Sequence, residues 1–209
     1  VGILALEIER AGAVAVGEDL GVVEASAREH LAERGVLGTS ILWFERDEDG
    51  DPVPAPEWRE LCLASVTTHD LPPTAGYLDG EHLRLRDRLD LLSRPIEEET
   101  TEDEAARAEW LETVRRVEDF VPGDVESTVT ALHRYLAHAP SRLLNVALTD
   151  AVGDVRVQNQ PGTDASQYPN WCIPLSGPDG APVALEEVRT SPRAAALADA
   201  VNEAIAAQR

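Results

Sequence analysis

Four short apolar runs constrain the fold of this chain more than any other feature. They are continuous rather than alternating, and they cover residues 13–16, 41–44, 61–66 and 143–148. Apolar side chains at consecutive positions are typical of strands buried on both faces, as in a parallel sheet covered by helices. The first prediction is therefore an α/β fold built on four buried strands.

Helical patterns lie between those runs. Residues 24–34 carry apolar side chains at helical spacing and stop at Gly35, a residue suited to the left-handed conformation that ends many helices. The same spacing of three and four recurs over residues 81–92, 103–120, 125–137 and 192–208. Strands that alternate with helices indicate a parallel sheet, and the middle stretches predict a helical insertion too long for a simple crossover.

Charge and composition limit the partners. The 209 residues include 18 basic and 39 acidic side chains, so the net charge is −21. This charge repels phosphate backbones and anionic lipids, and no apolar run approaches the ~20 residues that span a bilayer. We expect a cytoplasmic protein that binds neither nucleic acid nor membrane, with Cys62 and Cys172 reduced because they lie far apart in sequence.

The start of the sequence indicates a fragment. There is no methionine, and Val1 is followed at once by a helical pattern of Ile3, Leu4, Leu6 and Ile8. The length fits one ordinary domain or a piece of one. We expect residues 1–209 to be part of a single domain from a longer chain.

Acidic residues follow two of the apolar runs. The first run is followed by GEDLG at 17–21, and the third by TTHDLP at 67–72. In a parallel barrel the loops at the carboxyl ends of the strands converge and carry the chemistry, so Glu18 and Asp70 are candidates for a catalytic pair in one cleft. The residues alone equally allow Glu18 to serve a helix N-terminus and Asp70 to form a turn before the two prolines.

Other acidic segments have simpler interpretations. The DEDGD run at 47–51 loosely resembles a calcium loop, but it lacks the later glutamate of an EF-hand and prolines follow it, so a surface turn is predicted. The glutamates at 97–99 are expected to complement the dipole of the helix they open. The sequence contains no metal-ligand cluster.

Three ordered motifs resemble those of the 4-α-glucanotransferases, also called amylomaltases or disproportionating enzymes. They are GEDLG, TTHDLP, and NQPGT at 159–163 followed by PNW at 169–171. The resemblance runs essentially from end to end. It implies the C-terminal half, strands five to eight, of a (β/α)8 TIM barrel with a helical insertion, within one catalytic domain.

The resemblance also implies an activity: transfer of a 1,4-α-glucan segment to an acceptor glucan or glucose, with retention of configuration. Its substrates would be α-1,4-glucans and maltodextrins, and it implies no cofactor. Glu18 would be the acid/base, and Asp70 would stabilise the transition state. The nucleophilic aspartate would lie upstream of Val1, so the fragment alone is expected to be inactive. Two other hypotheses stay open, an α-glucan hydrolase of the same clan and a non-catalytic glucan-binding fragment.

The resemblance further assigns substrate contacts, to His69, Asp19, Trp43, Asn159, Asn170 and Trp171. Alternatives remain for several of them. His69 could instead be the hydrogen-bond partner of Asp70, the residues of the last motif could shape their loop, and Trp43 could pack in the core. Because half a barrel exposes two sheet edges, the fragment is expected to self-associate or to need its missing N-terminal half.

Overall fold

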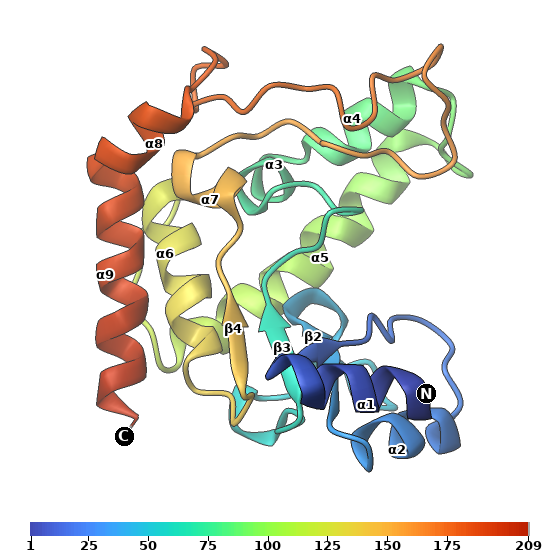
Figure 1. Cartoon of the computed structure of the whole chain (residues 1–209). Helices are drawn as coiled ribbons and strands as arrows, with labels where there is room; N and C mark the ends of the chain where they lie inside the picture. The colour runs from blue at the N-terminus through green and yellow to red at the C-terminus, as the bar shows by residue number, and fades with distance from the viewer. Residues whose placement is uncertain (209) are drawn as a thin grey trace.

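A four-stranded parallel sheet forms the centre of the computed structural model, which describes residues 1–208. The strands follow the chain in the order β1-β2-β3-β4, and each pairs in parallel with the next. Their bounds are Ala15–Val16 (β1), Val36–Ile41 (β2), Cys62–Ser65 (β3) and Leu143–Asn145 (β4). The predicted parallel α/β arrangement is confirmed (Figure 1).

The predicted position of the second strand is wrong. The strand β2 ends at Ile41, and residues Leu42–Phe44 form a 3-10 turn. The sequence misleads here because β2 contains polar residues whose hydrogen bonds are made inside the fold. Ser40 is fully buried and its Oγ accepts from the thiol of Cys62 on β3 at 3.3 Å. Burial on both faces also holds only for β2 and β3, since β1 and β4 are half-buried to exposed.

Helices occupy most of the remaining chain. They are α1 (Gly2–Ala11), α2 (Ala25–Ala32), α3 (Thr74–Asp79), α4 (Glu81–Arg88), α5 (Ile96–Arg115), α6 (Val125–Leu136), α7 (Leu148–Val152), α8 (Leu185–Thr190) and α9 (Pro192–Ala207). The longer predicted helices are confirmed, although α5 starts earlier than residue 103 and takes Glu97–Glu99 into its first turn. The short helices α3, α7 and α8 were not predicted. Within residues 1–208, no helix is long and apolar enough to cross a membrane.

The core lies between β2, β3 and the long helices. In Figure 1, α5 crosses behind the sheet while α6 and α9 stand beside β4. Trp110 of α5 and Leu132 of α6 are almost completely buried. The Trp110 ring meets the Trp58 ring edge-on at 6.4 Å, and the hydroxyl of Tyr135 accepts a hydrogen bond from Ala55 N at 3.0 Å. These contacts fix the irregular link between β2 and β3.

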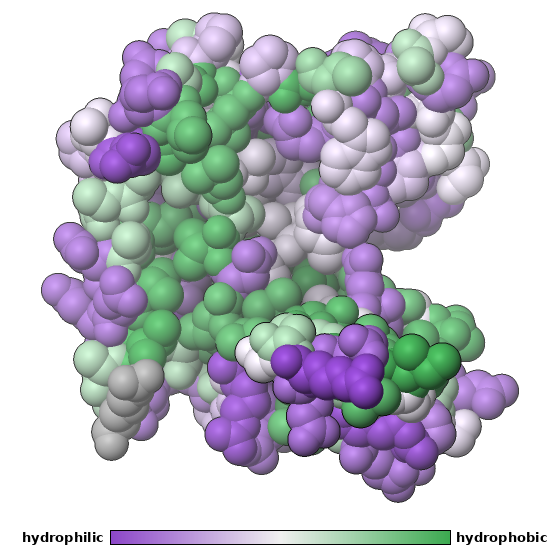
Figure 2. Space-filling model, viewed as in Figure 1, coloured by the Kyte–Doolittle hydropathy of each residue, from purple (hydrophilic) through white to green (hydrophobic). Residues whose placement is uncertain are grey.

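The two outer strands are left uncovered. Val16 at the β1 edge and Leu143 at the β4 edge are both more than one-third exposed. Figure 2 shows hydrophobic residues over β4, and a hollow between the part that carries α1 and α2 and the part that carries α4. The helix α1 also exposes apolar side chains, with Ile3 81% exposed. The sheet is therefore open at both of its edges, along β1 and along β4.

Candidate active site

The end of β1 places Glu18 at the carboxyl end of the parallel sheet, and we call this end the mouth. Gly17 N donates to Leu37 O at 2.7 Å, and Thr39 Oγ1 donates to Gly17 O at 3.1 Å, so the chain stays paired to β2 beyond the last strand residue. Glu18 is then exposed and lines a cavity of about 350 Å³ together with His69 from the loop after β3. We call this space the Glu18 cavity. Two motifs distant in sequence thus face one hollow.

Asp19 has an environment unlike that of its neighbour. Asp19 is only 7% exposed. Its carboxylate accepts hydrogen bonds from Thr39 N at 2.8 Å and from Arg59 at 2.6 Å, and Arg28 lies 3.1 Å from it. Burial acts to raise the pKa of Asp19, but the hydrogen bonds from Arg59 and Thr39 and the charges of Arg59 and Arg28 outweigh it, so the pKa is lowered. Arginines and backbone thus hold the Asp19 carboxylate in place, and its substrate contact stays a prediction.

Local hydrogen bonds shape the loop after β3. Thr67 Oγ1 donates to Pro72 O at 2.8 Å and closes the loop at its base, while Asp70 N donates to Thr68 Oγ1 at 3.2 Å. This turn exposes the side chains of His69 and Asp70 to solvent. His69 thereby lines the Glu18 cavity, whereas Asp70 is exposed beside it and is not among the lining residues.

Asp70 meets a residue from the last motif. Asn159 Nδ2 donates to Asp70 Oδ1 at 2.5 Å, and His69 Nε2 lies 3.5 Å from Asp70 Oδ2. Asn159 and Asp70 are 89 positions apart in the sequence. Asp70 is thus oriented by an amide on one side and an imidazole on the other.

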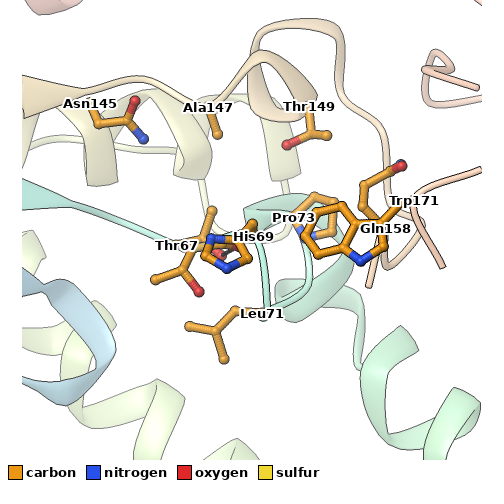
Figure 3. Close-up of a pocket in the computed structure, with 10 residues that line it drawn as sticks. Thr67, His69, Leu71, Pro73, Asn145, Ala147, Thr149, Gln158 and Trp171 are labelled. Atoms are coloured by element: carbon orange, nitrogen blue, oxygen red, sulfur yellow. Dashed lines mark hydrogen bonds between the residues drawn. The ribbon is translucent and has the colours of Figure 1, made fainter. Parts of the chain in front are cut away.

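A second cavity of about 370 Å³ adjoins the first. It is lined by His69, Gln158, Trp171 and others (Figure 3), and we call it the Trp171 cavity. The rings of His69 and Trp171 lie 5.6 Å apart, and Trp171 is 62% exposed. Both cavities share Thr67, Thr68, His69 and Asn145. An exposed aromatic ring beside amides and hydroxyls is suited to a polyhydroxylated ligand.

Asn170 shapes the loop that carries Trp171. Its Oδ1 accepts from Gln160 N at 2.7 Å and its Nδ2 donates to Thr163 Oγ1 at 2.8 Å. Trp171 N in turn donates to Gln158 O at 3.0 Å. Between the two interpretations of Asn170 left open by the sequence, these contacts favour loop-shaping.

Trp43 lies outside the mouth. It is 9% exposed and its ring centroid lies 4.5 Å from that of Tyr77 in the hydrophobic core. Of the two interpretations left open by the sequence, this environment favours core packing for Trp43, because the ring is covered by protein. Its neighbour Phe44 is the exposed member of the pair, at 52%.

Sequence reasoning missed three residues of the mouth. Asn145 lines both cavities, and Gln158 and Thr149 line the Trp171 cavity. A signal for Asn145 was present, because it is a polar residue at the carboxyl end of a strand, where the two motifs also lie. Its position inside an apolar run hid that signal. Gln158 and Thr149 carried no such signal, because only the folding of residues after β4 brings them to the cavity.

Comparisons with known proteins agree with this arrangement. The family model described as 4-alpha-glucanotransferase matches residues 1–179. The 4-alpha-glucanotransferase of Mycobacterium tuberculosis (strain H37Rv) is 59% identical over 211 residues, which is 98% of this chain and 29% of that protein. The chain thus spans less than a third of that relative.

Solved structures share the fold. The crystal structure of amylomaltase from Corynebacterium glutamicum superposes with a TM-score of 0.91 at 44% identity, over 96% of this chain and 30% of that one. An amylomaltase from Streptococcus agalactiae in complex with acarbose gives a TM-score of 0.60 at 19% identity, over 97% and 34% of the two chains, and shows the fold alone. The parallel sheet with its helices is a half-barrel matching the amylomaltase structure. This chain belongs to the 4-alpha-glucanotransferase family.

Proposed function

We propose that residues 1–209 are the C-terminal portion, strands five to eight, of the catalytic barrel of a 4-α-glucanotransferase. One observation carries the proposal: Glu18 and His69, from loops that follow different strands, line the same cavity, and Asp70 lies beside His69. Family membership supports the activity, and the open edges of the sheet support the position within a barrel.

The proposed mechanism gives each carboxylate a separate task. A retaining transferase needs a nucleophile and an acid about 5–5.5 Å apart on the two sides of the scissile bond. The nucleophile attacks the anomeric carbon while Glu18 protonates the departing glycosidic oxygen, which leaves a glycosyl-enzyme intermediate. Glu18 then takes the proton from the 4-hydroxyl of an acceptor glucan as that oxygen attacks the intermediate and releases the nucleophile. The nucleophile is contributed by the part of the barrel before residue 1.

Asp70 and the mouth loops act on the sugar itself in this proposal. Asp70 hydrogen-bonds the hydroxyls of the distorted ring and stabilises the positive charge that develops there. Asn159 and His69 orient the Asp70 carboxylate or bind the same sugar hydroxyls, since both side chains approach that carboxylate. Trp171 offers an exposed ring to a neighbouring sugar unit.

The test is disproportionation of maltotriose by the longer protein that carries this chain. Formation of oligomers longer than maltotriose supports the proposal, whereas glucose and maltose as sole products identify a hydrolase. The 209-residue chain alone should form no product, because the proposed mechanism takes its nucleophile from another part of the barrel. Transfer by the isolated chain would contradict the assignment of its residues.

The uncovered edges lead to a proposal about partners of the isolated chain. Val16 and Leu143 are exposed at opposite edges of the sheet, and unpaired edge strands with apolar side chains associate readily. We expect the isolated chain to self-associate unless the N-terminal half covers these edges. Sedimentation velocity measures this directly, and a monomer with cooperative unfolding would contradict it.

A further inference from the structure

The end of β4 places a polar side chain between the two cavities. Asn145, the last residue of the strand, is exposed and lines both the Glu18 cavity and the Trp171 cavity. Figure 3 shows it across the Trp171 cavity from Thr67 and His69. A chain of sugars that occupied both cavities would pass this side chain.

Hydrogen bonds to the neighbouring strand fix how the Asn145 amide is oriented. Ser65 is 3% exposed, and its Oγ donates its single hydrogen to Thr67 O at 2.7 Å. Because a carbonyl can only accept, the Ser65 oxygen has only its lone pairs left to offer. It therefore accepts from Asn145 Nδ2, at 3.1 Å, and the amide cannot turn its oxygen toward Ser65 without losing that bond.

The rest of the amide is available to a ligand. Within residues 1–208, Asn145 Oδ1 has no hydrogen-bond donor, and Nδ2 uses one of its two hydrogens on Ser65. A sugar hydroxyl both donates and accepts, so a fixed amide with one free acceptor and one free donor complements adjacent hydroxyls of a glucan.

We propose that Asn145 binds the glucan where it passes from one cavity to the other, and that Ser65 is a positioning residue that holds the Asn145 amide. This inference rests on the proposed function and extends it, because no motif assigned a role to either residue. The same Ser65 hydroxyl contacts the base of the loop that carries His69, through Thr67 O. The contact residue and that loop are thus tied to one buried group.

The experiment is steady-state kinetics with maltotriose in the full-length protein. Asn145→Ala should raise KM about five- to tenfold, the loss expected for one or two hydrogen bonds, and leave kcat within about twofold because the lost contact is made equally before and during reaction. Ser65→Ala should raise KM by less, and Ser65→Thr, which keeps the hydroxyl, should restore it. The double variant Ser65→Ala/Asn145→Ala should have the KM of Asn145→Ala, since Ser65 acts through Asn145.

Controls separate binding from folding. Asn202→Ala, on the exposed face of α9, removes an amide that lines neither cavity and should keep the wild-type KM. Thermal unfolding of each variant checks the fold, and Asn145→Ser provides a smaller truncation should the alanine variant unfold. An Asn145→Ala KM within about twofold of wild type would overturn the inference, as would effects of the two substitutions that simply add.

The outcome also distinguishes this inference from the proposed function. A wild-type protein that transfers glucan while Asn145→Ala behaves normally refutes only the role of Asn145. A wild-type protein that does not transfer refutes the function. Calorimetric titration with maltoheptaose then tests by itself whether Asn145 contacts the glucan. Equal affinities of wild type and Asn145→Ala for maltoheptaose would reject it.

Discussion

Two adjacent carboxylates that follow β1, those of Glu18 and Asp19, have opposite environments. Asp19 is buried and fully engaged by Arg59, Arg28 and Thr39 N, whereas Glu18 is exposed in a cavity at the mouth. Within residues 1–208, no hydrogen bond or ion pair reaches the Glu18 side chain. The fold itself supplies the partners of the buried carboxylate, whereas it leaves the exposed one without a partner in a hollow.

The largest test of this comparison replaces the free carboxylate. Glu18→Gln in the full-length protein should lower transfer by about 10²–10⁴-fold, because the amide cannot donate or accept the transferred proton. Its thermal unfolding should match wild type, since no partner is lost. The measurement is oligomer formation from maltotriose, and Glu112→Gln, exposed on α5, is the matched control. Unchanged turnover would remove Glu18 from the mechanism.

Replacing the partnered carboxylate should have the reverse pattern. Asp19→Asn leaves Arg59 and Arg28 without their counter-charge, so the free energy of unfolding should fall by about 1–3 kcal/mol, at the low end because both arginines reach water. Chemical denaturation measures the loss. Asp199→Asn, exposed on α9, should show none. Equal stability of Asp19→Asn and wild type would break the comparison.

The same variant carries a pH signature. The pKa of Asp19 is lowered in the folded state, so its contribution to stability is present above the unfolded pKa and disappears as pH falls through the folded one. The difference between wild type and Asp19→Asn should be full above about pH 5 and should shrink below about pH 4. A difference that is constant down to the acid limit would show that charge is not its cause.

A smaller effect is expected at Asp70. Asn159→Ala removes the amide that donates to Asp70 Oδ1, a hydrogen bond to a charged but exposed group. We expect about a tenfold loss in kcat/KM with little change in stability. Kinetics with maltotriose provide the measurement, and Asn202→Ala again serves as control. A change in KM alone, with kcat unaltered, would place Asn159 in binding rather than in orienting Asp70.

The sequence predicted the architecture better than the roles of individual residues. Continuous apolar runs located three of the strands, and periodicity located the long helices, because both signals come from burial of one or two faces of an element. The second strand was misplaced because it contains buried Ser40 and Thr39, which give no apolar signal: the Ser40 hydroxyl accepts from Cys62, and the Thr39 hydroxyl donates to Gly17 O. Trp43 was ambiguous since an aromatic ring after a strand suits either core or ligand.

By itself, the sequence determined that a parallel sheet carries Glu18 and Asp70 after two of its strands, because alternation of buried runs and helices leaves few other arrangements. The tertiary structure decided which of two adjacent acids, Glu18 or Asp19, faces the hollow. It also decided that Asn159 reaches Asp70 and that Asn145 stands between two cavities. Contacts between residues so distant in sequence depend on strand order and loop path, which local patterns of charge and hydrophobicity do not encode.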